Sequence, residues 1–252
     1  MSFPFSKRPL AHCLLAALLA AGAAPCVLAT PADKPTSTQF QSVIDSSLRT
    51  ADDKKGDAKR KPAEFLAFAM VKPGMKALDV ASGGGATAQL LAAAVGSAGS
   101  VWAQTGKPSE AMEKRLAAAP QANFHPVVKG FDNPVPDGVS GLDLITINMS
   151  YHDIVNTPTD RGAMNKHLLD ALRPGGHLVI IDNAANAGTG LNDTKTLHRI
   201  EKKAVMDELV KAGFVLDGES DYLAVPGDPR KEPFFKMDGK PDDKFALRFV
   251  KK

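Results

Sequence analysis

Short apolar runs alternate with amphipathic segments along most of the chain. The apolar runs show no regular alternation of apolar and polar residues, which predicts strands that are covered on both faces. They span 76–81, 100–104, 124–128, 142–149 and 177–181, with late strands at 214–216 and 244–250. Segments with helical periodicity lie between them at 87–95, 108–118, 160–172 and 196–212. This alternation predicts a single α/β domain, Rossmann-like and doubly wound, whose mostly parallel sheet carries an antiparallel late strand.

The segment ahead of the first strand is polar at its start and then helical in pattern. Residues 30–61 indicate a leader followed by an amphipathic lead-in helix over 43–60. Pro62 stands where a further helix would begin, and Pro73-Gly74 would end it. We therefore place the folded domain at 62–252.

The N-terminus has the pattern of an export signal. Two basic residues, Lys7 and Arg8, precede an apolar stretch over 10–28 that a glycine and a proline interrupt. Small residues around Ala29 suit a signal peptidase. We expect residues 1–29 to be a cleaved signal peptide, which places the mature chain outside the cytoplasm, in the periplasm, with no stable membrane anchor.

Cysteine use and charge narrow the chemistry further. Cys13 and Cys26 both lie in the predicted signal, so the mature chain has no disulfide, thiol nucleophile or cysteine metal site. Loss of Lys7 and Arg8 removes two charges from a formal net charge of +3. A nearly neutral mature chain gives no reason to expect nucleic acid as a partner. The oligomeric state stays open.

A glycine-rich junction follows the first predicted strand. Asp79-Val80-Ala81-Ser82-Gly83-Gly84-Gly85 joins that strand to the helix over 87–95. Glycines let the backbone turn sharply and approach a ligand, and the helix directs the positive end of its dipole into the same space. The junction predicts either a ligand site at the carboxyl edge of the sheet or a tight turn without a ligand.

The order of several segments resembles the class I S-adenosylmethionine-dependent methyltransferases. These segments are LDVASGGG, VWAQTG, GFDNPVPDG, LDLITINMSYHD and LRPGGHLVIID, in chain order. The chain is similar, more narrowly, to exported bacterial proteins described as predicted methyltransferases. The features of that narrower match are RKPAEFLAF, MSYHD and TLHRIEKKAV. The resemblance implies S-adenosylmethionine as cofactor and a small molecule as methyl acceptor.

The resemblance also implies where the cofactor would lie. Gly83 and Gly85 would face its methionine part, Gln104 and Thr105 its ribose, and Phe131 and Asp132 its adenine. The complete set of implied cofactor residues is Asp79, Ala81, Ser82, Gly83, Gly85, Gln104, Thr105, Phe131, Asp132 and Asn148. We expect Gly85→Val to weaken cofactor binding far more than it lowers stability.

Two positions depart from the family pattern. Ala81 replaces a usual glycine, and Gln104 stands where a carboxylate usually takes both ribose hydroxyls. An amide lacks the charge assistance of a carboxylate, so ribose binding should be weaker by about 1–2 kcal/mol. Gln104 could equally be an ordinary polar residue at a strand end.

The sequence Tyr151-His152-Asp153 directly follows the fourth strand and is the candidate catalytic cluster. A histidine can act as a base near neutral pH, and an adjacent carboxylate can orient it. The alternative is structural: Asp153 would cap the next helix and His152 would pack beside it.

A second candidate set could shape the acceptor pocket. Asp182 ends the fifth strand, and His198 and Arg199 are expected to begin the helix over 196–212. The alternatives are a turn residue for Asp182 and a surface ion pair for Arg199. No HExxH pattern occurs and no two histidines stand at helical spacing, so we expect no metal.

Three functions fit these patterns to different degrees. The first is an S-adenosylmethionine-dependent methyltransferase. The second is an exported binding protein of the same fold with little or no turnover, which the export signal and the missing ribose carboxylate favour. The third is a dinucleotide oxidoreductase, which Gly83-x-Gly85-x-x-Ala88 allows but the missing acid of the second strand opposes.

Overall fold

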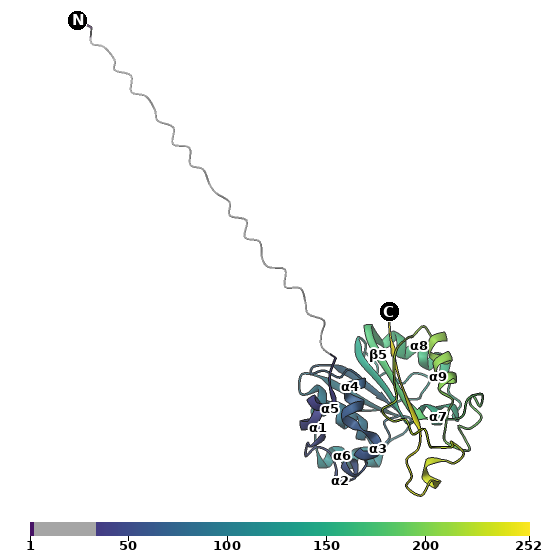
Figure 1. Cartoon of the computed structure of the whole chain (residues 1–252). Helices are drawn as coiled ribbons and strands as arrows, with labels where there is room; N and C mark the ends of the chain where they lie inside the picture. The colour runs from purple at the N-terminus through teal and green to yellow at the C-terminus, as the bar shows by residue number, and fades with distance from the viewer. Residues whose placement is uncertain (3–33) are drawn as a thin grey trace. The chain divides into compact units, whose positions relative to one another are not determined.

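The computed structural model of the chain describes residues 1–2 and 34–252 (Figure 1). The predicted signal peptide, including Cys13 and Cys26, therefore falls outside the described residues except for its first two positions. Within the described part, none of the helices combines the length and the apolar character that a membrane span requires. Residues 34–252 form one compact unit, so the lead-in segment belongs to the same unit as the sheet.

Seven strands form one sheet in the order β3-β2-β1-β4-β5-β7-β6. They are β1 (Lys76–Val80), β2 (Ser100–Thr105), β3 (Phe124–Val128), β4 (Leu142–Asn148), β5 (Leu172–Asn183), β6 (Val215–Ser220) and β7 (Lys244–Val250). The first five strands pair in parallel, and β7 runs antiparallel between β5 and β6. The predicted fold class is confirmed. Strand order reverses between β1 and β4, which is where doubly wound folds bind their ligands.

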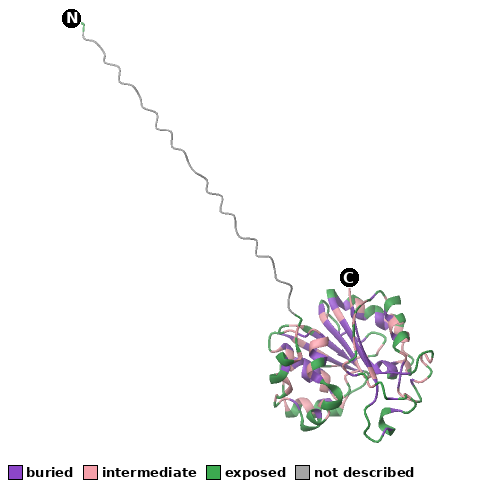
Figure 2. Ribbon diagram, in the orientation of Figure 1, coloured by how far each residue is buried: buried purple, intermediate pink, exposed green. Residues whose placement is uncertain are grey.

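Helices cover both faces of the sheet. The larger ones are α4 (Pro62–Phe68), α5 (Ala86–Val95), α6 (Glu110–Ala118), α8 (Arg161–Ala171) and α9 (Lys202–Lys211), and α7 (Tyr151–Val155) is a short one. One apolar core joins alternate strand residues such as Leu78 and Ile145 to α7, α8 and α9. The other joins Ala77 and Val101 to α4 and α5. Figure 2 shows the strands buried between these two helical layers.

The lead-in segment differs from the single helix predicted over 43–60. It forms a 3-10 turn η1 (Ser37–Phe40) and three short helices, α1 (Gln41–Ile44), α2 (Ala51–Lys55) and α3 (Asp57–Arg60). Thr50 starts a new helix because its side chain accepts a hydrogen bond from the amide of Asp53, as an N-cap does. Phe40 is buried in the core with α4 and α5, which docks the segment on the domain.

The late helix also starts later than predicted. It begins at Lys202, whereas residues around Ile200 leave helical geometry to bridge Ala184. Arg199 is fully buried there, and its guanidinium pairs with Asp228 at 2.8 Å. This tertiary contact overrides the helical pattern of 196–201.

Arg115 of α6 connects the lead-in segment to the glycine junction. Its guanidinium donates to Asp53 of α2 at 2.6 and 3.0 Å, to the Gln89 side chain at 2.6 Å and to the Gly84 carbonyl at 2.8 Å. Burial would raise the pKa of Asp53, but hydrogen bonds from Arg115 and Thr50 outweigh it and hold that pKa at about 2.

We expect Asp53→Asn to lower the free energy of unfolding by about 2–3 kcal/mol at neutral pH, because charge-assisted hydrogen bonds are lost. Because the pKa of Asp53 is lower in the folded chain than in the unfolded chain, its carboxylate stabilises the fold at pH values above the unfolded pKa near 4. This contribution disappears as the pH falls toward 2. Urea unfolding at several pH values checks this: the gap between the two proteins should close on acidification. Asp52→Asn, at an exposed neighbour, should change little; a constant gap across pH would contradict the assignment.

Candidate active site

The junction after β1 forms the floor of the site. Ala81, Gly83 and Gly85 have positive φ angles of 55°, 57° and 79°. The Ser82 amide donates to the Gln104 carbonyl at 2.8 Å, which ties the junction to the end of β2. Glycine is required at most such positions, and Ala81 adopts one at an energetic cost.

The three glycines have different surroundings. A Cβ added to Gly83 would meet nothing within 4 Å, whereas one at Gly85 would meet Phe124 at 3.2 Å and Met112 at 3.4 Å. Gly83 therefore borders open space, and Gly85 packs against α6 and β3. This packing favours a direct loss of stability in Gly85→Val, in contrast to the expectation that the change would act mainly on cofactor binding.

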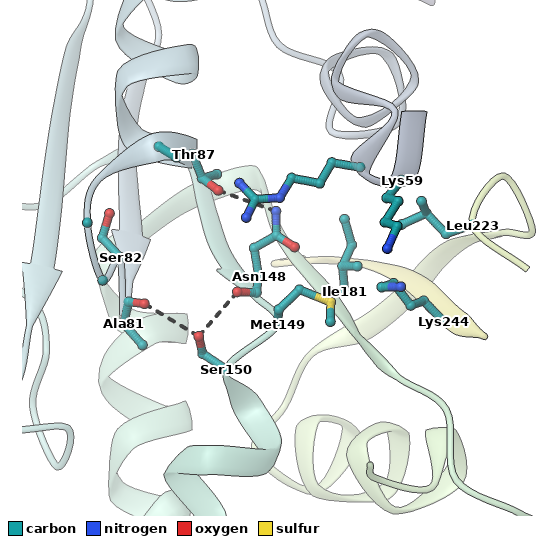
Figure 3. Close-up of a pocket in the computed structure, with 14 residues that line it drawn as sticks. Lys59, Ala81, Ser82, Thr87, Asn148, Met149, Ser150, Ile181, Leu223 and Lys244 are labelled. Atoms are coloured by element: carbon teal, nitrogen blue, oxygen red, sulfur yellow. Dashed lines mark hydrogen bonds between the residues drawn. The ribbon is translucent and has the colours of Figure 1, made fainter. Parts of the chain in front are cut away.

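Two cavities meet at Gly83. The smaller has a volume of about 250 Å³ (Figure 3) and the larger about 570 Å³, and Ala81, Gly83 and Ser150 line both. The other residues of the smaller cavity are Lys59, Arg60, Ser82, Gly84, Ala86, Thr87, Asn148, Met149, Ile181, Leu223 and Lys244. The remaining residues of the larger cavity are Thr105, Gly106, Lys107, Pro108, Ser109, Phe131, Asp153, Ile154 and Thr157.

Asp79 supports the junction from below. It is buried, and its carboxylate accepts hydrogen bonds from Ser82 at 2.5 Å and Thr146 at 2.7 Å. Burial raises the pKa of Asp79 to about 6, and the two hydrogen bonds only partly offset that rise. Asp79 lines neither cavity, so in this structure it orients Ser82 instead of facing a ligand directly.

Gln104 has a structural role that the sequence did not reveal. It is fully buried: its Oε1 accepts from the Ala81 amide at 3.0 Å and its Nε2 donates to the Lys129 carbonyl at 2.6 Å. A carboxylate could not donate the second bond, which explains the amide at this position. Both polar atoms are engaged, so the expected ribose contact from Gln104 does not occur in this geometry, and Thr105 lines the larger cavity in its place.

Of the two residues expected beside the adenine, only Phe131 lines one of the two cavities. Phe131 forms a wall of the larger cavity, whereas Asp132 accepts a hydrogen bond from the Asp160 amide at 2.7 Å and lies outside the lining. Asn148 lines the smaller cavity, and its side chain reaches Thr87 at 3.5 Å. Asp132 thus fixes the start of α8, and Phe131 is the aromatic surface open to a ligand.

Tyr151 is a structural residue. It is fully buried, donates to Glu208 at 2.8 Å and accepts from Asn165 at 2.9 Å. Burial raises the pKa of Tyr151 above its usual value, and the carboxylate of Glu208 adds to that rise. The phenol faces α8 and α9 and lines neither cavity, which contradicts a catalytic role.

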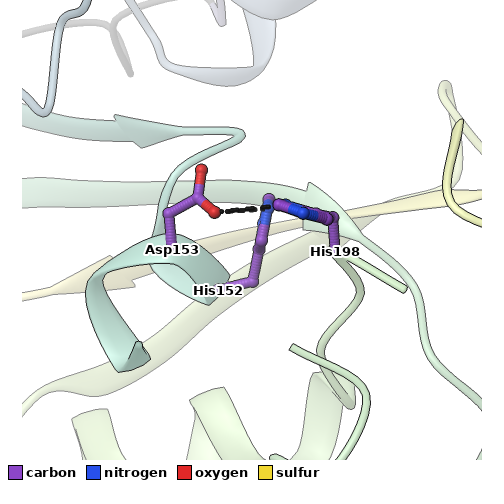
Figure 4. Close-up of side chains that lie close together, drawn as sticks. All are labelled: His152, Asp153 and His198. Carbon is purple, nitrogen blue, oxygen red and sulfur yellow. Dashed lines mark ion pairs between the residues drawn. The ribbon is translucent and has the colours of Figure 1, made fainter. Parts of the chain in front are cut away.

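His152 and Asp153, the other two candidate catalytic residues, contact Asp182 and His198, which the sequence suggested for the acceptor pocket. His152 Nδ1 lies 2.6 Å from Asp182 Oδ1, and the His152 amide donates to Asp182 Oδ2 at 2.9 Å. Asp153 Oδ1 lies 3.3 Å from both His152 Nε2 and His198 Nδ1 (Figure 4). Of these four described residues, only Asp153 lines one of the two cavities. The sequence placed them in separate groups, and the fold brings them together at the ends of β4 and β5.

The charge state of His152 limits its chemistry. Burial alone would lower the pKa of His152, but hydrogen bonds to Asp153 and Asp182 outweigh it and raise the pKa to about 9. The whole residue is only 2 % exposed. A protonated, enclosed imidazole is a poor general base at neutral pH, so the expected base role does not follow from this structure.

Arg199 cannot reach an acceptor in this structure. Besides Asp228, its guanidinium donates to the carbonyls of Ala184 at 3.0 Å and Glu232 at 2.9 Å. It is neither a surface ion pair nor a pocket residue. It anchors the segment that carries His198.

Comparison with known proteins agrees with this geometry. The sequence profile of the protein-L-isoaspartate (D-aspartate) O-methyltransferase family, PCMT, matches residues 34–218. The chain belongs to this family. No curated protein matches it significantly in sequence.

Solved structures share the fold at low identity. A SAM-dependent methyltransferase from Aquifex aeolicus superposes with a TM-score of 0.59 at 18% identity, covering 87% of this chain and 100% of the other. A TehB-like SAM-dependent methyltransferase from Corynebacterium glutamicum gives 0.51 at 17% identity, covering 80% and 99%. These two support the fold, and membership of PCMT makes the chain a methyltransferase that uses S-adenosylmethionine.

The two cavities fit the two halves of S-adenosylmethionine. The larger, with Phe131, Ile154 and Thr105, offers apolar and aromatic surface plus a hydroxyl, which suits an adenosine. The smaller, with Ser82 and Arg60, offers hydrogen-bond donors and positive charge, which suits the carboxylate of a methionine. The bare backbone at Gly83 joins them.

Sequence reasoning missed the cations of the smaller cavity. Lys59 and Arg60 belong to a basic cluster, Lys59-Arg60-Lys61, ahead of the first strand, and a short cluster of this kind is ordinarily solvated. Lys244 stands at the start of β7 and carries no local signal. Only docking of the lead-in helices beside β4 and β7 brings the three together.

We expect Gly83→Ala to weaken S-adenosylmethionine binding at least tenfold, because a methyl group would enter the space between the cavities. Both glycines have positive φ, so each alanine costs about 1–2 kcal/mol of backbone strain. Gly85→Ala is the matched control: it should lower stability further through contact with Phe124 but affect affinity less. Calorimetric titration and thermal unfolding of both variants check this. Equal affinity losses in the two variants would contradict the assignment.

Proposed function

We propose that the enzyme transfers the methyl group of S-adenosylmethionine to a carboxylate of its acceptor. The observation that carries this proposal is the convergence of two lysines on the smaller cavity. The amino groups of Lys59 and Lys244 point toward one another beside Leu223 (Figure 3). Lys244 pairs with Asp242 at 2.5 Å, and Lys59 makes no ion pair within the described residues. Two ammonium groups around one space favour an anion between them.

The absence of a base supports the same class of acceptor. Among the described residues that line the smaller cavity, none is an aspartate, glutamate or histidine. A hydroxyl or ammonium acceptor would need to lose a proton, whereas a carboxylate with a pKa near 4 is already ionised at neutral pH. The raised pKa of His152 likewise makes it unsuited to proton removal.

The reaction then requires alignment more than acid–base chemistry. A carboxylate oxygen attacks the methyl carbon as the carbon–sulfur bond breaks, which leaves a methyl ester and a neutral thioether. The chain would hold the acceptor through Lys59 and Lys244 and fix the junction through Gln104. Positioning of two reactants can itself supply much of a rate enhancement.

Arg60 has different neighbours and would serve the cofactor. It lines a further small cavity with Ala86, Thr87 and Asn148, beside the start of α5. Among the described residues it forms no ion pair, so its guanidinium is free for the methionine carboxylate. The cations thus divide into one for the cofactor and two for the acceptor.

We favour a small carboxylic acid as acceptor because the smaller cavity, of about 250 Å³, would have to hold the methionine half of the cofactor as well. A second candidate is an isoaspartyl or D-aspartyl residue of a polypeptide, which the name of the matching family favours. Transfer of labelled methyl to a panel of small acids and to an isoaspartyl peptide separates the two. Tight cofactor binding without transfer to any acceptor would support a binding protein with little or no turnover.

We expect Lys59→Gln and Lys244→Gln each to raise the acceptor KM by about 10–100-fold, the cost of one charge-assisted hydrogen bond. The Kd for S-adenosylmethionine should stay within about twofold, whereas Arg60→Gln should raise that Kd by about 10-fold or more. Steady-state kinetics and calorimetry measure the two effects. Lys211→Gln, an exposed change on α9, is the control. If the lysine variants altered only the Kd for S-adenosylmethionine, the assignment of Lys59 and Lys244 to the acceptor would be contradicted.

We also propose that the chain is exported to the periplasm after cleavage near Ala29. The basic residues and the apolar stretch of the N-terminus support this. N-terminal sequencing of the protein from separated cell fractions tests it: the expected product is periplasmic and begins close to Thr30. An uncleaved chain in the cytoplasm would contradict export without affecting the methyltransferase assignment.

A further inference from the structure

A cluster of side chains of the types that bind metal ions lies beside the larger cavity, and one of them, Asp153, also lines that cavity. We propose that His152 Nε2, Asp153 Oδ1 and His198 Nδ1 bind one divalent transition-metal ion, such as Zn²⁺ (Figure 4). This site goes beyond the proposed methyl transfer and does not depend on which acceptor the enzyme uses.

The spacing of the three ligand atoms suits a small ion. Asp153 Oδ1 lies 3.3 Å from each histidine nitrogen, and all three atoms lie within 4.8 Å of one another. Zinc binds nitrogen and oxygen at about 2.0–2.2 Å, so two ligands in tetrahedral geometry stand about 3.3–3.5 Å apart. Two of the distances therefore already match, and the two histidine nitrogens lie within 4.8 Å of one another.

Asp182 provides the outer support that metal-binding histidines have. Its Oδ1 lies 2.6 Å from His152 Nδ1, so that nitrogen keeps its proton when an ion binds. The ion would displace the proton on Nε2, the nitrogen that lies beside Asp153. Asp182 is itself held by the amides of His152 at 2.9 Å and Asn183 at 2.8 Å. A carboxylate–histidine–metal arrangement orients the ring and makes it a better ligand.

The segment that carries His198 is held in an unfavourable backbone conformation. His198 has a positive φ of 52°. Its carbonyl accepts from Asn183 Nδ2 at 3.0 Å, and the next residue is the buried Arg199 paired with Asp228. Phe235 packs against the outer edge of the ring, with centroids 5.4 Å apart. Residues held under such strain by their surroundings concentrate at functional sites.

The ligand set and its exposure define the class of ion. Two imidazoles and one carboxylate suit zinc, iron, cobalt or nickel more than magnesium or calcium, which prefer oxygen ligands alone. Three protein ligands leave at least one coordination position open. Asp153 lines the larger cavity and its side chain is 57% exposed, so that position is accessible from solvent.

Cobalt titration of the purified, chelator-treated full chain tests the proposal. We expect one Co²⁺ per chain with a Kd below about 10 μM and visible absorption bands of a four-coordinate N/O site. Zn²⁺ should displace the cobalt and remove the bands. The titration needs neither cofactor nor acceptor, so its failure is distinct from failure of the proposed methyl transfer.

His198→Asn is the decisive variant, because asparagine tolerates the positive φ and removes the imidazole. It should weaken Co²⁺ binding by more than about 100-fold. Loss of a residue that only hydrogen-bonds to a metal ligand typically weakens binding by about 10–100-fold. His167→Asn, at an exposed histidine of α8, is the matched control and should bind within about twofold of the original chain.

Asp153→Asn, at a half-exposed position, gives a second test with little risk to folding, which circular dichroism verifies. It should weaken Co²⁺ binding at least about tenfold. No saturable binding, or equal binding by the His198 and His167 variants, would overturn the proposal. The three side chains would then form a hydrogen-bonded cluster without a metal ion.

Discussion

The backbone of the junction after β1 is the constraint on which the site depends. It must leave a buried strand, pass through three positive φ angles and leave Gly83 bare between two cavities. Such a turn is unfavourable alone, so the surroundings must hold it. Gln104 holds it from within the sheet and Arg115 from the side, each through hydrogen bonds to its backbone. Neither of these two side chains lines the cavities beside Gly83, since both are used to support the junction.

This constraint also links segments that are distant in sequence. Arg115 also donates a hydrogen bond to Asp53, so the lead-in helices help to support the site. The same helices bring Lys59 and Arg60 to the smaller cavity. A segment that the sequence indicated to be a lead-in helix ahead of the folded domain therefore supplies both support and charge. The match of the PCMT profile begins at residue 34, ahead of these helices.

Local pattern was sufficient to predict the fold. Runs rich in aliphatic residues without regular alternation, such as 142–149, mark buried parallel strands, and the glycine junction marks the edge where ligands bind. Side-chain roles were less predictable because burial and distant partners decide them. Gln104, Tyr151 and Arg199 are polar residues next to site segments, yet each is turned inward to a partner that the sequence does not identify: the Lys129 carbonyl, Glu208 and Asp228. The cluster of His152 with His198 likewise forms only through the fold.

The central claim is that the two cavities joined at Gly83 together hold one S-adenosylmethionine. Calorimetric titration of the chain with S-adenosylmethionine, and with NAD for comparison, tests it most directly. The account predicts saturable one-to-one binding of S-adenosylmethionine and none of NAD under the same conditions. Absence of S-adenosylmethionine binding by a folded chain, or equal binding of NAD, would contradict it.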